Sequence, residues 1–282
     1  ARSGAGGDQP GLPVEHRGIP HVCLVEFRAR LVKADMTGFL KDRMLAVAKR
    51  AGAIGHRRVV DSTGIADSVV TQDTVTLIRT AARLCLDRLA VIDPAVSATL
   101  MAGLRRQDYD QPGKPQILWV SADARAELIN DLFADATTII DACAGIDDEV
   151  LVAHVELLRI VAGQDVEDDD AGGVRIRQGV APDRTISTVD RDARHGHRSR
   201  KDRYDGYKLH VSTDTESDLI TAIDATTATT HDATVLAELL DADPVPVQEV
   251  IADTHYGSAD TRQRLADDGV ELVAPAPPSS AG

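Results

Sequence analysis

Apolar residues recur along the chain with two different periods. In four segments they return every three or four positions, which places them on one face of an α-helix. These segments are 36–51, 73–89, 124–144 and 149–162, and the third has the most regular apolar stripe. We expect all four helices to pack their stripes into a core, and we assign no chemistry to them.

Beyond Gly173 the pattern changes to the two-residue alternation of half-buried strands. It is clearest in "YKLHVSTD" at 207–214, and the short polar turn before "DLITAID" predicts a hairpin. Residues 163–173, "GQDVEDDDAGG", have the charge and glycine content of a solvated loop. Further segments predict an isolated strand in "HRRVVDSTG" ending at Asp61, helices in "HDATVLAELL" and "SADTRQRLADDG", and strands in "EVIAD" and "VELVAPAP".

The predicted order is strand, helical block, two strands, helix, strand, helix, strand. A hairpin combined with a β-α-β crossover gives a mixed sheet with helices on its faces, so the expected class is α/β. At 282 residues and 43% hydrophobic content, the chain is long enough to bury a large core. No apolar run approaches bilayer length, and the three cysteines stand far apart, so we expect a cytoplasmic protein with buried thiols and no membrane contact.

Charge is distributed unevenly. A net charge of −14 argues against nucleic-acid binding by the chain as a whole, because phosphate contacts need Lys and Arg. Within 191–208, however, seven Lys or Arg face three Asp. This strip is either a solvated loop or a local attraction for a polyanion.

Two aspartates have similar surroundings. Asp61 and Asp253 each follow a short apolar run and precede small polar residues. On adjacent strands their carboxylates would meet at one edge of the sheet, where hard oxygen ligands hold Mg²⁺. An Asp at such a junction is more often a turn former or a helix cap, and spacing alone leaves both readings open.

Four segments taken together resemble bacterial insertion-sequence transposases of the DDE class, which have an RNase H-like catalytic core. The segments are "RRVVDSTGI", "APDRTISTVDRDARHGHRSRKDRYDGYKLHVSTDTESDLITAI", "TTHDATVLAELL" and "EVIADTHYGSADTRQRLADDGVELVAPAP". In addition, "LVEFRARLVKADMTGFLKDRMLAVAKRAG" is similar to the helical N-terminal domain of that family, and "GQDVEDDD" fits it too.

The resemblance implies a domain division and a fold. It implies a partial helical N-terminal domain at 24–56 and an RNase H-like DDE catalytic domain at 57–282, and the Gly-rich start predicts a flexible segment at 1–23. The last domain contains a helical insertion at about 74–163, for dimer contacts or DNA-end binding.

Carried over to this sequence, the resemblance makes Asp61 and Asp253 the first two catalytic acids, both ligands of Mg²⁺ or Mn²⁺. It implies hydrolysis at the end of an element and then attack of the freed 3′-hydroxyl on target DNA. The family's third acid is a Glu on a helix further along, whereas Glu271 lies in a strand-like segment and is not assigned that role. We therefore expect the chain to be truncated before that acid, with weak activity or none.

The resemblance also favours double-stranded DNA as the partner of the basic strip. The candidate phosphate-contacting residues are Arg194, Arg198, Arg200, Lys201, Arg203 and Lys208. For His195 and His197 we favour exposed or DNA-contacting positions over metal ligation.

Four other residues receive structural expectations. We expect Asp232 to cap a helix, with a catalytic role as the alternative. We expect His255 to contact a metal ligand, Tyr256 to pack a turn and Trp119 to anchor the core.

The function expected is that of a transposase, impaired by the loss of its third acid, which forms homo-oligomers on DNA in the bacterial cytoplasm near the nucleoid. The alternative is a non-catalytic remnant that binds DNA or full-length transposase. A functionless decayed protein and a nuclease that only hydrolyses DNA are two further readings. Metal-dependent nicking, strand joining and DNA binding distinguish the four.

Overall fold

The structure is a computed structural model that describes residues 20–111, 113–170, 172–198 and 201–276. The chain divides into two compact units, Ala1–Gly55 and His56–Gly282. The described part of the first unit contains α1 (His21–Lys33) and α2 (Phe39–Arg50), and α2 confirms the helix predicted at 36–51. Cys23 on α1 is exposed, so the prediction of a buried thiol is wrong for this residue.

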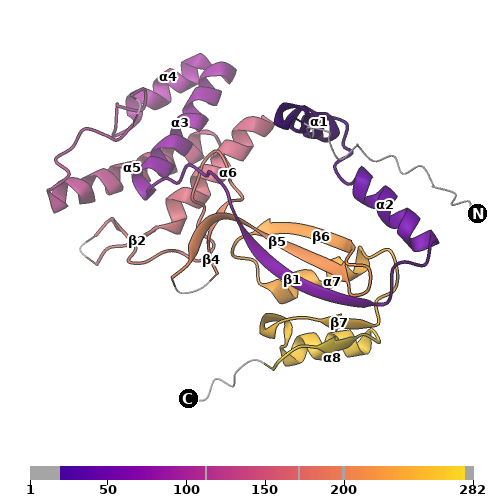
Figure 1. Cartoon of the computed structure of the whole chain (residues 1–282). Helices are drawn as coiled ribbons and strands as arrows, with labels where there is room; N and C mark the ends of the chain where they lie inside the picture. Colours follow the sequence, from indigo (N-terminus) through magenta and orange to yellow (C-terminus); the bar gives the residue numbers. More distant parts are fainter. Residues whose placement is uncertain (1–19, 112, 171, 199–200, 277–282) are drawn as a thin grey trace, which may run out of the picture. The chain divides into compact units, whose positions relative to one another are not determined.

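The second unit includes a helical segment, seen at the upper left of Figure 1. Its helices are α3 (Thr74–Ile92), α4 (Pro94–Gly103), α5 (Ala122–Ala142) and α6 (Glu149–Gln164). They share one core that contains the fully buried Leu77, Leu89, Leu132 and Leu158. The apolar periodicity predicted α3, α5 and α6, and the structure confirms these three.

The sequence pattern missed α4. Pro94 is an apparent stop signal after α3, but it stands at the first position of α4. Asp93 caps this helix by accepting the backbone N–H of Ala95 and Val96, both at 3.0 Å. A proline is favourable at the first helical position because its missing N–H would have no intrahelical partner there.

Trp119 does not anchor the core as predicted. Its side chain is 36% exposed, and the Lys114 ammonium lies 5.4 Å from the centre of its ring. The residue stands two positions before Ser121, which caps α5 through a hydrogen bond from Ala124 N. Its place in the connection to α5, outside the helix, keeps it away from the buried stripe.

The rest of the second unit is built on a mixed sheet. Its strands are β1 (Arg57–Ala66), β4 (Arg194–His197), β5 (Arg203–Asp214), β6 (Ile220–Thr227), β7 (Glu249–Ile251) and β8 (Glu271–Val273). The order is β4-β5-β1-β7-β8, and β6 pairs with β5 beyond the part that β4 covers. β5 is antiparallel to β1, whereas β7 is parallel to both β1 and β8. This topology confirms the predicted α/β class and the RNase H-like arrangement.

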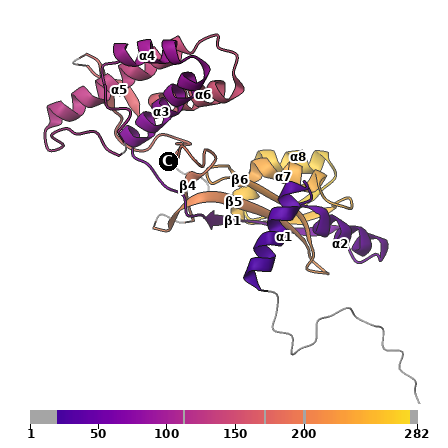
Figure 2. The same ribbon diagram turned by 90° about the horizontal axis from the view of Figure 1, so that it is seen from above.

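Helices α7 (Asp232–Asp241) and α8 (Ala259–Asp267) cover one face of this sheet, as Figure 2 shows from above. Their contact with the sheet forms a second core. The buried members of this core are Val60, Ala222, Val235, Leu236, Leu239, Val250, Tyr256 and Leu265. As predicted, Ser258 caps α8 by accepting the N–H of Thr261 at 3.1 Å, and Gly269 follows the helix with a φ of 74°.

Two predictions about strands need correction. β1 does not end at Asp61 but continues to Ala66, because nine of its residues pair with β5 from Arg58 to Ala66. The segment predicted as a solvated loop contains β2 (Val166–Asp168), which pairs with β3 (Val174–Ile176). Buried Val166 packs into the helical core, and this contact fixes the start of the hairpin.

Candidate functional site

Asp61 lies within β1, on the sheet face opposite to α7 and α8. Adjacent residues of a strand point to opposite faces, and Val60 is buried in the core under these helices. Asp61 itself is exposed and pairs across the strands with Val211. Its Oδ1 accepts the N–H of Ser62 at 2.7 Å. It borders a shallow hollow of about 200 Å³, also lined by Val59, Ser62, Thr63, Val211 and Thr213.

Asp253 stands two residues after the end of β7. The ladder with β8 continues through Ala252, whose N–H donates to Val273 O at 3.1 Å. Asp253 then caps a short 3₁₀ helix, η1 (Thr254–Tyr256), by accepting the N–H of His255 at 2.8 Å. The His255 ring also contacts its other carboxylate oxygen at 3.0 Å, and this hydrogen bond raises the pKa of His255. About half of the Asp253 side chain, 52%, is exposed.

The two aspartates lie on neighbouring parallel strands. Val59 of β1 stands opposite Ile251 of β7. Asp61 stands two residues further along β1, and Asp253 stands two residues beyond the end of β7. The charges of both aspartates act on Tyr256. Burial raises the pKa of its hydroxyl, and the negative charges of Asp232, Asp253 and Asp61 raise it further.

A buried polar cluster lies under the helix-covered face beside these aspartates. Lys208 and His210 on β5 stand opposite Gly64 and Ser62 of β1. The Lys208 ammonium donates to the Asp232 carboxylate at 3.0 Å and to Thr230 O at 2.7 Å. Burial lowers the pKa of His210.

Asp232 is the first residue of α7 and does not cap it. The cap is His231, whose ring nitrogen accepts the N–H of Ala233 at 3.3 Å. The predicted capping role of Asp232 is therefore wrong. Its carboxylate turns towards Lys208 because that ammonium offers a charged partner in a site where both side chains are largely buried.

The residues of the basic strip differ in their surroundings. Arg194 is largely buried and pairs with Asp183 at 3.0 Å, while Lys208 pairs with Asp232 as described above. Arg198 is half exposed, donates to Gly64 O at 2.5 Å and lies 5.6 Å from the centre of the Tyr204 ring. Arg203 and Lys201 are exposed, and Arg200 lies outside the described residues.

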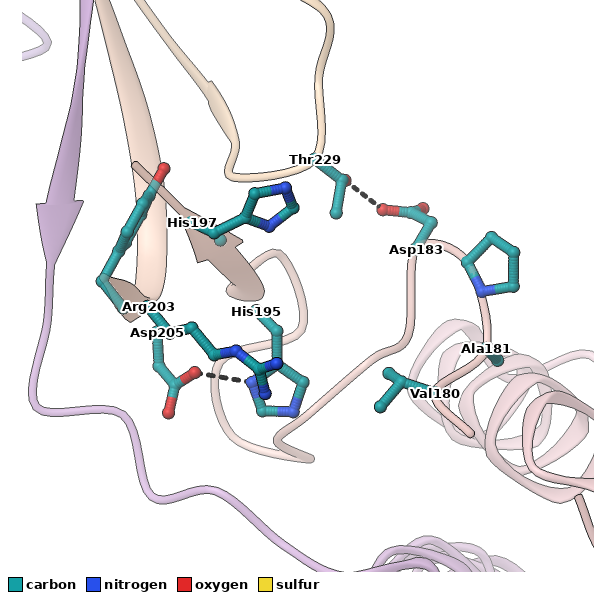
Figure 3. A pocket seen from close by; sticks show the side chains of 11 residues that line it. Val180, Ala181, Asp183, His195, His197, Arg203, Asp205 and Thr229 are labelled. Carbon is teal, nitrogen blue, oxygen red and sulfur yellow. Dashed lines mark hydrogen bonds and ion pairs between the residues drawn. The ribbon is translucent and has the colours of Figure 1, made fainter. Parts of the chain in front are cut away.

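A cavity of about 770 Å³ opens beside the β4–β5 hairpin (Figure 3). The side chains of His195, His197 and Arg203 line it, together with Asp205 and Asp183. His195 Nδ1 contacts Asp205 at 2.6 Å, so one of its ring nitrogens is already engaged. With two imidazoles and a guanidinium, the cavity offers donors that suit phosphate oxygens.

The donor set at Asp61 and Asp253 suits a hard cation in kind, because both side chains are exposed carboxylates. It is incomplete in number. Among the residues that the structure describes, no three His, Cys, Asp or Glu side chains gather closely enough to hold a metal ion. Glu271 pairs with Glu249 of β7, four residues before Asp253, which separates the two acids by about 13 Å along the strands.

Sequence reasoning missed Asp232 and the surroundings of Tyr256. The polar residues at alternate positions of β5, Lys208 and His210, face the helices, and this is the signal that could have found them. A lysine and a histidine on the buried side of a strand require a buried acceptor, since charged groups are rarely buried without a partner.

The fold and the paired aspartates define an RNase H-like protein with a candidate phosphoryl-transfer site. Residues 173–280 match the family described as the transposase DDE domain. The match includes Asp253, Asp232 and the basic strip, and over this part of the chain it confirms the predicted resemblance to DDE-class transposases. No curated protein matches the chain. Of the helices that the structure describes, none combines the length and the apolar character needed to cross a lipid bilayer.

Proposed function

We propose that the chain cleaves and joins DNA as an insertion-sequence transposase, with Mg²⁺ or Mn²⁺ held by Asp61 and Asp253. The observation that carries the proposal is the parallel register of β1 and β7, with Val59 opposite Ile251. It supports a site in which both carboxylates project at the same level of the sheet. The family match at 173–280 supports the transposase class.

The proposed chemistry is two in-line displacements at phosphorus. Water first attacks a phosphodiester at the end of the element, and the freed 3′-hydroxyl then attacks target DNA. Divalent ions, when bound, stabilise the negative charge on the attacking and leaving oxygens. The contribution of the chain is rigidity, because a paired strand carries Asp61 and a capped turn carries Asp253. Both carboxylates are exposed, so a DNA backbone can reach them.

The proposed DNA contacts follow from the surroundings of the basic strip. Arg198 and Arg203 point from the β4–β5 hairpin, and Arg198 touches β1 at Gly64, three residues beyond Asp61. With Lys201 and Arg200 they would position a phosphate backbone beside the acids. Arg194 and Lys208 have internal acidic partners, so we assign them to holding the hairpin and α7 in place.

We also propose a division of the chain into two domains. We assign residues 24–56 to a helical N-terminal domain and 57–282 to the catalytic domain, with the helices between 74 and 163 as an insertion for assembly on DNA. We also propose homo-oligomers on DNA in the bacterial cytoplasm near the nucleoid.

A second function is a non-catalytic remnant that binds DNA or full-length transposase. The position of Glu271 favours it, because this residue pairs with Glu249 and stands at the far end of the strands from Asp253. A site with two acids would bind metal more weakly than one with three and turn over slowly. DNA binding would survive this loss, since the basic strip does not depend on the acids.

Plasmid nicking separates the two functions. The full chain is incubated with supercoiled DNA and Mg²⁺ or Mn²⁺, beside Asp61→Asn, Asp253→Asn and a control, Asp123→Asn, at an exposed first-turn position of α5. Transposase chemistry predicts nicking that requires metal and is lost in the first two variants only. DNA binding without nicking supports the remnant. Nicking that survives both substitutions refutes the assigned site, and absence of both activities refutes both functions.

A further inference from the structure

Two buried polar atoms beside the candidate site lack a hydrogen-bond partner among the residues that the structure describes. They are His210 Nδ1 and Tyr256 Oη, and both residues are 0% exposed. A buried donor without a partner is costly, and such groups in native proteins require a structural explanation. The Asp232 carboxylate lies just beyond hydrogen-bond range of His210 Nδ1, and its charge acts on the Tyr256 hydroxyl.

One distance and one electrostatic interaction relate Asp232 to these two atoms. Its Oδ1 lies 3.9 Å from His210 Nδ1, which is just beyond hydrogen-bond range. Its charge also acts on the Tyr256 hydroxyl, together with those of Asp253 and Asp61. Of these three acids Asp232 alone is buried, at 8% exposure, so it is the acceptor that a buried hydroxyl can reach without meeting solvent.

Tyr256 connects this buried carboxylate to both candidate metal ligands. It is the last residue of η1, the turn that Asp253 caps. The Ser62 side chain approaches this hydroxyl and lowers its pKa by a hydrogen-bonding interaction, although the two groups do not reach the geometry of a full hydrogen bond. Ser62 follows Asp61 and donates its N–H to that carboxylate. Tyr256 is therefore adjacent to both acids, because it belongs to the turn that Asp253 caps and its hydroxyl approaches the residue that follows Asp61.

We propose that Asp232 is a positioning residue of this site. Its carboxylate accepts the Tyr256 hydroxyl through one water, which also serves His210, and thereby holds the Asp253 turn beside Asp61. Lys208 compensates the buried charge and orients the carboxylate. The inference rests on the proposed function, because it presumes that Asp61 and Asp253 bind a divalent ion.

A simpler role for Asp232 is structural. An acidic residue in the first turn of a helix is stabilising through the helix dipole, and an ion pair with Lys208 adds to this. A purely structural role predicts a lower melting temperature in Asp232→Asn but an unchanged metal affinity in the folded variant. It also predicts that Tyr256→Phe has no effect on metal binding, since the hydroxyl would have no partner to lose.

Mn²⁺ binding to the full chain, followed by electron paramagnetic resonance in about 0.2 M KCl to screen weak surface sites, tests the inference. Wild type is compared with Asp61→Asn, Asp232→Asn, Tyr256→Phe, the double variant of the last two, and Asp123→Asn as the control. Loss of a group that orients a metal ligand weakens affinity about 10-fold or more. We expect this loss in both single variants, with Tyr256→Phe still melting near the wild-type temperature.

The double variant gives the sharper result. If Asp232 and Tyr256 act through one link, the double variant binds Mn²⁺ about as weakly as either single variant. If Asp61→Asn abolishes binding while Tyr256→Phe retains wild-type affinity, the inference is wrong and the proposed metal site stands. If Asp61→Asn binds Mn²⁺ as wild type does, or wild type does not bind it, the proposed site fails and the inference fails with it.

Discussion

Replacement of Arg58 by methionine should strongly destabilise the sheet. The Arg58 guanidinium is completely buried between two carboxylates. Its Nε and Nη2 donate to Asp243 at 2.6 and 2.7 Å, and its Nη1 donates to Asp214 at 2.9 Å. Asp214 also accepts the N–H and the hydroxyl of Ser217. One side chain thus joins β1 to the β5–β6 turn and to the end of α7.

The expected magnitude follows from what the substitution leaves behind. Removal of one partner from a buried ion pair costs about 3–5 kcal/mol, because the other charge remains buried without compensation. Arg58→Met leaves two buried carboxylates without the guanidinium. Asp214 keeps its hydrogen bonds from Ser217, whereas Asp243 loses both of its hydrogen bonds from Arg58. We therefore expect a loss of about 4 kcal/mol, which for a domain of this size lowers the melting temperature by about 8–16 °C.

Thermal unfolding followed by circular dichroism measures this change. The neighbouring Arg57 gives a matched control, because it pairs with Glu249 at 2.7 Å on the surface, with more than half of its side chain exposed. Surface pairs contribute little, so Arg57→Met should melt close to wild type. Equal melting temperatures for Arg58→Met and Arg57→Met would refute the view that the buried network holds β1 in its register.

Three further outcomes are expected. Gly64→Ala should destabilise the hairpin and impair DNA binding, because a Cβ at this position would lie 2.4 Å from the Tyr204 ring. Adding Tyr204→Ala to this variant should partly restore its stability in differential scanning fluorimetry. Burial lowers the pKa of His210 below its value in the unfolded chain. The contribution of His210 to stability is therefore present above about pH 6.5 and is lost as the pH falls. The melting temperature of His210→Gln should depend less on pH between about 5.5 and 7.5 than that of wild type. Arg198→Ala and Arg203→Ala should each weaken duplex binding and reduce the salt slope by about 1 in fluorescence anisotropy titrations, and an unchanged slope would remove them from the interface.

The sequence predicts the elements whose signals are local. The helices α3, α5 and α6 carry apolar stripes long enough to exclude a strand, and the hairpin of β5 and β6 alternates regularly around a polar turn. Capping by Ser258 and termination by Gly269 are likewise decided by residues within a few positions of each other. For these elements tertiary contacts agree with the local preference and add to it.

The wrong predictions concern residues whose positions are decided by partners distant in sequence. β1 continues past Asp61 because nine pairs with β5 outweigh the turn tendency of "DSTG". Asp232 leaves the cap to His231 because Lys208, 24 residues away, offers a charged partner. The position of Trp119 depends on how its connection leaves the helical core, and periodicity carries no information about that.

The alternation of β1 explains why a single strand can serve the core and the candidate site at once. Arg58 and Val60 point to the side of α7 and α8, where one forms the buried ion network and the other packs the core. Asp61 points to the opposite side and remains exposed, while Ser62 returns to the side of Tyr256. The rigidity demanded of a metal ligand therefore comes from its neighbours in sequence. A shift of β1 by one residue relative to β5 would bury Asp61 and expose Val60. The Arg58 network holds β1 in its register, and this register is what keeps the Asp61 carboxylate exposed.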